Sequence, residues 1–203
     1  MLFRSVQVAG FMGGGCSGAV SELAFGGVWT QAVVHPASYA WRCAMYDVRS
    51  GHGLTLGGMT IGCVGHNELH SFDGVSWAQT LATNLPSPRW GAKAAQDPVS
   101  GRILFVGGRI ACNNGNQDYV DDVFWLDVGA VDRMNWVAAS TSPSLATLSK
   151  HALAPLPAGG ALLFGGATSN GPLPFTYELQ LASWAKQYSL LNPMVRTDHS
   201  LLL

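Results

Sequence analysis

The chain has 203 residues, of which 48% are hydrophobic and 11% charged, and its formal net charge at pH 7 is −1. This balance excludes the basic footprint that nucleic acid or an anionic membrane surface requires. The charged fraction is well below the roughly 25% of typical globular domains. It favours either a compact β protein with neutral polar residues outside or a chain with a large partner interface.

The four cysteines, Cys16, Cys43, Cys63 and Cys112, form no C-x-x-C pair. This spacing argues against a zinc site, and we expect neither a metal nor another cofactor. Reduced thiols, as in a cytosolic protein, are the simplest interpretation. No apolar run approaches the 18 residues of a membrane-spanning helix, so no membrane span is expected.

Taken in chain order, the sequence repeats one pattern. An apolar strand ends in glycines at 10–15, and the pattern returns in "GLTLGG", "GRILFVGG" and "GALLFGG". An alternating strand and then a tryptophan follow each time, as in "DDVFWLD" at 121–127 before Trp136. No stretch has helical periodicity of useful length, so an all-β fold is predicted.

The spacing of the repeat is informative. After Trp29, Trp77 and Trp136, the next glycine pair begins 28, 30 and 29 residues later, at Gly57, Gly107 and Gly165. The distance from a glycine pair to the following tryptophan is more variable, at 20, 29 and 19 residues. The constant arm indicates a structural unit, whereas the variable arm contains a loop that accepts insertions.

A period of about 50 residues with four strands, a glycine pair and a late tryptophan resembles the kelch repeat. The resemblance covers almost the whole chain and is weakest at the N-terminus. It implies a single kelch-type β-propeller domain built of four-stranded antiparallel blades. The blades expected are 1–32 closed by 196–203, 39–82, 89–140 and 149–190.

Two interpretations of the blade count stay open. The chain begins in the phase of a second strand and ends in that of a first strand, "RTDHSLLL". The C-terminal strand could complete the N-terminal blade and close a small four-bladed ring, which removes exposed sheet edges. The alternative is an incomplete part of a larger propeller.

Function in such a fold is expected in the loops after the second and fourth strands. The longest is 109–120, and "HPASYAWR" at 35–42 is the second candidate. Amides, aromatic rings and arginine suit recognition of a peptide or a sugar. The alternatives are a solvated surface loop for the first segment and ordinary packing between blades for the second. The candidate residues are Arg109, Asn113, Asn114, Asn116, Gln117, Asp118, Tyr119, His35, Tyr39 and Trp41.

A basic residue follows each tryptophan: Arg42, Arg89, Lys150 and Arg196. The kelch resemblance implies that such residues can point toward a central channel and meet acidic ligands, so Arg42 and Arg89 join the candidate binding residues. The structural alternative is that each basic side chain bonds the loop carbonyls of a neighbouring blade.

No catalytic motif of the enzymatic relatives is found, and the six histidines are scattered along the chain. We therefore expect a non-enzymatic scaffold that binds a protein partner with the loops of one face. The alternative is a propeller that binds or modifies carbohydrate. A third possibility is a structural subunit of a large assembly.

Overall fold

The structure, a computed structural model, describes residues 5–12, 15–23, 29–31, 39–60, 62, 64–113, 116–129, 134–141, 145, 147–180 and 183–187, with side chains from 39 to 186 outside 111–117. Within these residues every regular element is a β-strand. The predicted all-β class is confirmed. No helix that could cross a membrane is present in this part of the chain.

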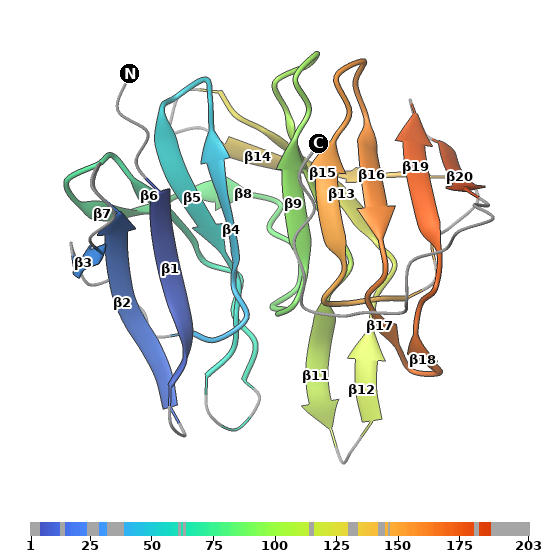
Figure 1. Cartoon of the computed structure of the whole chain (residues 1–203), viewed down its shortest axis with the longest axis horizontal. Helices are drawn as coiled ribbons and strands as arrows, with labels where there is room; N and C mark the ends of the chain where they lie inside the picture. Colours follow the sequence, from blue (N-terminus) through green and yellow to red (C-terminus); the bar gives the residue numbers. More distant parts are fainter. Residues whose placement is uncertain are drawn as a thin grey trace.

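Three complete sheets follow one another along the chain, and each is named here by its first strand (Figure 1). Each contains a four-stranded antiparallel meander in chain order, as the repeat predicted. The β4 sheet contains β4 (Cys43–Asp47), β5 (His52–Leu56), β6 (Leu69–Phe72) and β7 (Trp77–Thr80). The β9 sheet contains β9 (Lys93–Gln96), β10 (Ile103–Val106), β13 (Val123–Asp127) and β14 (Met134–Ala139). The β15 sheet contains β15 (Ala152–Pro155), β16 (Ala161–Phe164), β19 (Thr176–Gln180) and β20 (Ser183–Gln187).

The N-terminal sheet has three strands, β1 (Ser5–Met12), β2 (Gly15–Leu23) and β3 (Trp29–Gln31), in that order. The described strands form no closed ring. Closure of this sheet by 196–203 lies outside the described residues, so the blade count and the kelch assignment stay predictions.

The short strand β8 (Ala82–Thr83) departs from the predicted units. It falls at the end of the range 39–82, yet it pairs in parallel with β14 of the following sheet. The Thr83 hydroxyl and the Asn84 amide both donate hydrogen bonds to the Asn135 side-chain oxygen, at 2.6 and 2.9 Å. The linker between two sheets therefore covers part of an open outer edge.

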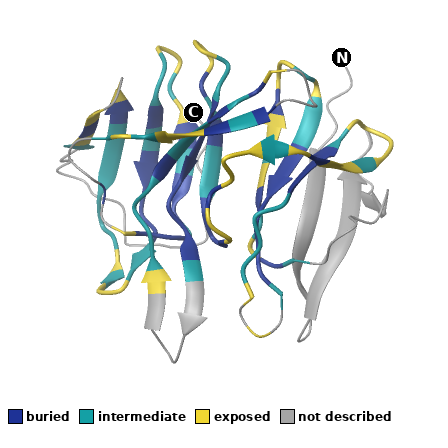
Figure 2. Ribbon diagram, turned by 180° about the vertical axis from the view of Figure 1, so that it is seen from behind, coloured by how far each residue is buried: buried dark blue, intermediate teal, exposed yellow. Residues whose placement is uncertain are grey.

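The first strands lie side by side, because β9 contacts both β4 and β15. Two apolar cores fill the spaces between sheets. One contains Leu54, Phe105 and Trp136, between the β4 and β9 sheets. The other contains Leu104, Leu163 and Trp184, between the β9 and β15 sheets. All four residues of β10 are buried because both faces of the middle sheet are covered (Figure 2).

The turns between the first and second strands are built by two equivalent segments, "DVRSG" from Asp47 and "DPVSG" from Asp97. In each turn the aspartate accepts hydrogen bonds from two backbone amides and from the serine hydroxyl, the last at 2.5 Å. The Gln96 amide also donates to Asp47 at 2.6 Å, which joins neighbouring sheets. We call this end of the sheets the hairpin face.

Candidate functional site

The glycine pairs mark the opposite end of the sheets, which we call the glycine-pair face. The three pairs, Gly57–Gly58, Gly107–Gly108 and Gly165–Gly166, directly follow β5, β10 and β16, as predicted. Their φ angles repeat closely, from 62° to 66° for the first glycine and from 97° to 110° for the second. This left-handed backbone is open to glycine at little cost.

The glycine pairs also let the next sheet approach. A Cβ atom on Gly57 would lie 2.6 Å from the Arg89 carbonyl oxygen, and one on Gly107 would lie 2.5 Å from that of Leu148. The amides of Gly58 and Gly108 donate to the same two oxygens, at 2.9 and 2.8 Å. The first two pairs are therefore backbone contacts with the residues that lead into the following sheet.

A second set of equivalent positions lies where the first strands begin. Trp41, Gly91 and Lys150 each stand two residues before their strand, with φ angles of 49°, 66° and 58°. The Gly91 amide donates to the Trp41 carbonyl at 2.9 Å, and the Lys150 amide donates to the Gly91 carbonyl at 2.7 Å. Backbone hydrogen bonds thus run from sheet to sheet across this face.

The side chains of Trp41 and Lys150 meet across Gly91. The Lys150 ammonium lies 4.7 Å from the centre of the Trp41 ring, although these residues belong to the first and third complete sheets. Trp41 stays 40% exposed. The glycine-pair face therefore presents an indole and an ammonium at the point where three sheets converge.

Tyr39 and Arg42 belong to a polar cluster on the β4 sheet. The Tyr39 ring stacks on His66 with centroids 3.9 Å apart, and the Arg42 guanidinium lies 4.8 Å from the Tyr39 ring. Glu68 interacts with His66 at 3.4 Å. Burial lowers the pKa of Arg42 to about 10, and burial together with Glu68 raises the pKa of Tyr39.

Arg109 lies between two aromatic rings. Its guanidinium carbon is 5.9 Å from the Trp90 ring centre and 4.6 Å from that of Tyr119, and the residue is 9% exposed. Burial lowers its pKa. Within the described part of the chain, Nε and Nη2 have no hydrogen-bond partner. These two nitrogens are one edge of the guanidinium fork, whose natural partner is a carboxylate.

Arg89, in contrast, has its donors satisfied inside the protein. It is 2% exposed and forms a bidentate ion pair with Asp122. It also donates to the backbone oxygens of Ser87 and Gly107, and to the Ser87 hydroxyl. The role of Arg89 is therefore structural, but its partners Gly107 and Asp122 belong to the same predicted blade, 89–140, and not to a neighbouring one.

The three described basic residues of the repeat have different surroundings. Arg42 and Lys150 stack on different aromatic rings, and Arg89 is buried in its ion pair. Counted from their first strands, Arg42 stands one residue before β4, Lys150 two before β15 and Arg89 four before β9. Arg196 lies outside the described residues.

The predicted loop at 109–120 is a β-hairpin of β11 (Arg109–Asn113) and β12 (Asn116–Tyr119). It follows Gly108 and projects beyond the sheets at the glycine-pair face, not at the hairpin face (Figure 1). A second, smaller hairpin, β17 (Ala167–Thr168) and β18 (Gly171–Pro172), lies in the next unit. Asp118 is exposed on β12. The side chains of Asn113, Asn116 and Gln117, and all of Asn114 and His35, lie outside the described residues.

The structure thus brings five predicted residues to one face: Tyr39, Trp41, Arg42, Arg109 and Tyr119. It adds Lys150 as the partner of Trp41, and Trp90, His66 and Glu68 as neighbours. The left-handed backbone at Trp41 and Lys150 has no sequence signal, because neither residue type favours it. Within the described residues no group of three or more His, Cys, Asp or Glu side chains could hold a metal ion.

Comparison with known proteins adds one relative and no family. The sequence matches no model of a known protein family. It is 29% identical over 136 residues to dynein regulatory complex subunit 7 of Chlamydomonas reinhardtii. The match covers 61% of this chain and 11% of the length of that relative. The chain is therefore similar to a small part of a protein that is a subunit of a larger complex.

Proposed function

We propose that this protein is a non-catalytic binding subunit of a larger protein assembly. Its sheets are the blades of a kelch-type propeller, and its partner docks on the glycine-pair face. The similarity to a subunit of the dynein regulatory complex supports membership of an assembly. The sequence repeat and the contacts between successive first strands support the propeller arrangement.

The observation that carries the docking face is the conformation of Trp41. A bulky residue at φ 49° pays a strain of about 1–2 kcal/mol, and such strain is commonly retained at functional sites. The equivalent position in the next sheet is Gly91, so the fold does not require an indole here. Trp41 is also 40% exposed, and tryptophan is a frequent hot-spot residue in interfaces.

The side chains around Trp41 indicate the chemistry that a partner must present. Trp41, Tyr39 and Tyr119 supply amphipathic rings, and Lys150 supplies an ammonium. Arg109 is buried between Trp90 and Tyr119 and adds a positive charge close to these groups. A protein segment with apolar side chains and a carboxylate complements this combination.

The test uses Trp41→Gly, which places the residue of Gly91 at the equivalent left-handed position. Relief of strain partly offsets the lost cation–π contact, the lost burial of the indole and the added freedom of the unfolded chain, each about 1 kcal/mol. We expect the free energy of unfolding to fall by about 1–2 kcal/mol. Partners recovered with the tagged full chain from its native cells should fall about tenfold or more, as quantified by mass spectrometry.

The matched control is Val48→Ser, which changes a side chain that is 75% exposed on the hairpin face. It should keep every partner. If Trp41→Gly folds normally and also keeps every partner, the docking face is elsewhere. If neither the wild type nor Val48→Ser recovers a partner, and the chain is monomeric in its native extract, the assembly proposal itself is wrong.

A further inference from the structure

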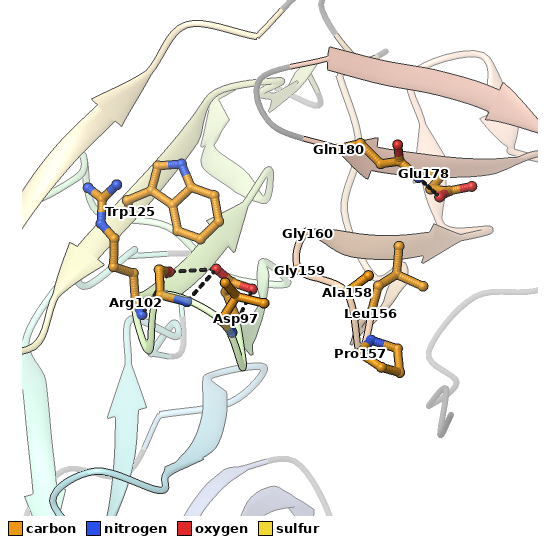
Figure 3. A pocket seen from close by; sticks show the side chains of 12 residues that line it. Asp97, Arg102, Trp125, Leu156, Pro157, Ala158, Gly159, Gly160, Glu178 and Gln180 are labelled. Atoms are coloured by element: carbon orange, nitrogen blue, oxygen red, sulfur yellow. Dashed lines mark hydrogen bonds between the residues drawn. The ribbon is translucent and has the colours of Figure 1, made fainter.

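We propose that a groove on the hairpin face binds a neutral, hydroxyl-rich ligand of the oligosaccharide class. The groove has a volume of about 610 Å³ and is bordered by the turn after Asp97 and by Leu156–Gly160 (Figure 3). This volume is typical of small-molecule sites. The groove lies at the opposite end of the sheets from Trp41, so this proposal is independent of the docking face.

An aromatic ring and an apolar wall form part of the groove. Trp125 is half-buried and lies in Figure 3 between Arg102 and the opposite wall, which Leu156 and Pro157 help to form. The Arg102 guanidinium is 5.2 Å from the Trp125 ring centre. An indole with a free part of its surface can cover the C–H face of a sugar ring and remove that apolar area from water.

Planar polar groups complete both sides of the groove. Arg102 donates from Nε to Asp127, which orients the guanidinium, and Gln180 donates to Glu178, which orients the amide. The Nη atoms of Arg102 and the Oε1 atom of Gln180 are not used in these two hydrogen bonds. Fixed donors on one side and a fixed acceptor on the other suit a ligand whose hydroxyl groups both donate and accept.

The charges select against anionic ligands. An anion in the groove meets the carboxylates of Asp97 and Glu178. The Arg102 guanidinium is paired with Asp127, so it does not offset these two negative charges. A neutral ligand avoids this repulsion and can use the donors and acceptors.

The test screens the full chain against arrayed neutral and anionic glycans, followed by calorimetry with the best neutral oligosaccharide. Because Trp125 packs against the core, it is changed to Phe, which keeps a ring, as well as to Ala. Gln180→Ala is the surface variant, since Gln180 is exposed. We expect about tenfold weaker binding for Trp125→Ala and Gln180→Ala, a smaller loss for Trp125→Phe, and wild-type affinity for Trp41→Gly.

The proposal is overturned if no neutral glycan binds, or if only sulfated or sialylated glycans do. Unchanged affinity in Gln180→Ala would also overturn it, because the ligand would then lie elsewhere. Loss of glycan binding in Trp41→Gly alone would move the site to the glycine-pair face. Failure here leaves partner docking through Trp41 unaffected, since the two faces are tested by separate variants.

Discussion

At the residue scale, glycine serves two separate purposes in this protein. Gly74 has a φ of 100°, and an added Cβ atom would meet nothing within 4 Å. Gly107 has a φ of 62°, and its added Cβ atom would lie 2.5 Å from the Leu148 carbonyl oxygen. The first residue needs only a left-handed backbone, whereas the second also holds open a contact between two sheets.

This difference gives the first stability prediction. Gly74→Ala should lower the free energy of unfolding by about 1–2 kcal/mol, the cost of a left-handed conformation for alanine. Gly107→Ala should lower it by a further 1–3 kcal/mol or so, because the backbone of the next sheet must also shift. Urea denaturation measures both. Equal losses would show that the sheets do not approach through Gly107.

Residue type predicted the backbone conformation least well at the left-handed positions. A glycine pair predicts a left-handed turn, and the three pairs that follow β5, β10 and β16 have one. Trp41 and Lys150 adopt the same region without any compositional sign. Their conformation follows from hydrogen bonds to Gly91, which connect three distant segments and so cannot be read from local sequence.

At the element scale, the two Asp-x-x-Ser-Gly turns join neighbouring sheets as well as strands. Burial alone would raise the pKa of Asp47, but hydrogen bonds from Ser50, the Arg49 amide and Gln96 outweigh it and hold the pKa below its ordinary value. The pKa of Asp97 is lowered in the same way, against the effect of burial, by Ser100 and nearby amides. Both turns therefore favour the ionised carboxylate.

The pH dependence of stability follows from this direction. A carboxyl group with a depressed pKa in the folded state contributes its stability above the unfolded pKa, near about pH 4, and loses it as the pH falls further. We expect the melting temperature to fall once the pH is lowered below about 4. Asp47→Asn should destabilise the protein at neutral pH and flatten the acid dependence, because the amide nitrogen cannot accept the two bonds from Ser50.

Thermal melts from acid to neutral pH measure this effect. Asp118→Asn, which changes an exposed residue of β12, is the control and should follow the wild-type curve. A wild-type profile retained by Asp47→Asn would show that the turn does not depend on the charged carboxylate.

The strands were largely predictable because the repeat places them at similar positions in each unit. The expected strands at 121–127 and 176–181 are found at Val123–Asp127 and Thr176–Gln180. The basic residues were harder to place because they were aligned from the tryptophans, and the intervening segment varies in length from unit to unit. Shifts of one to three residues place Arg42, Arg89 and Lys150 in different surroundings.

The β11–β12 hairpin shows a second limit of prediction. Its sequence, rich in amides, indicates a loop, but the pairing of β11 with β12 gives it strand structure. The groove at Trp125 was not predicted at all. Its residues come from the turn after Asp97, from β13 and from the β15 sheet, and no local pattern connects them.

At the scale of the whole molecule, the decisive relation is that between the first and third complete sheets. In a linear stack the middle sheet would separate them. Here Lys150 of the third unit reaches Trp41 of the first across Gly91. The first and third complete sheets therefore approach each other at the glycine-pair face, and this contact supports the proposed propeller arrangement.

Cross-linking tests this contact in solution. With Trp41→Cys and Lys150→Cys combined, a short bismaleimide should join the two positions within one chain, because their side chains meet in the structure. Peptide mapping by mass spectrometry distinguishes this product from links to the native cysteines. The control pair combines Lys150→Cys with Val75→Cys, which lies in the turn between β6 and β7 and is 76% exposed. That pair should stay unlinked, because Val75 is at the hairpin end of its sheet. Efficient linkage of the control, or none of the first pair, would mean that the three sheets do not converge at Gly91.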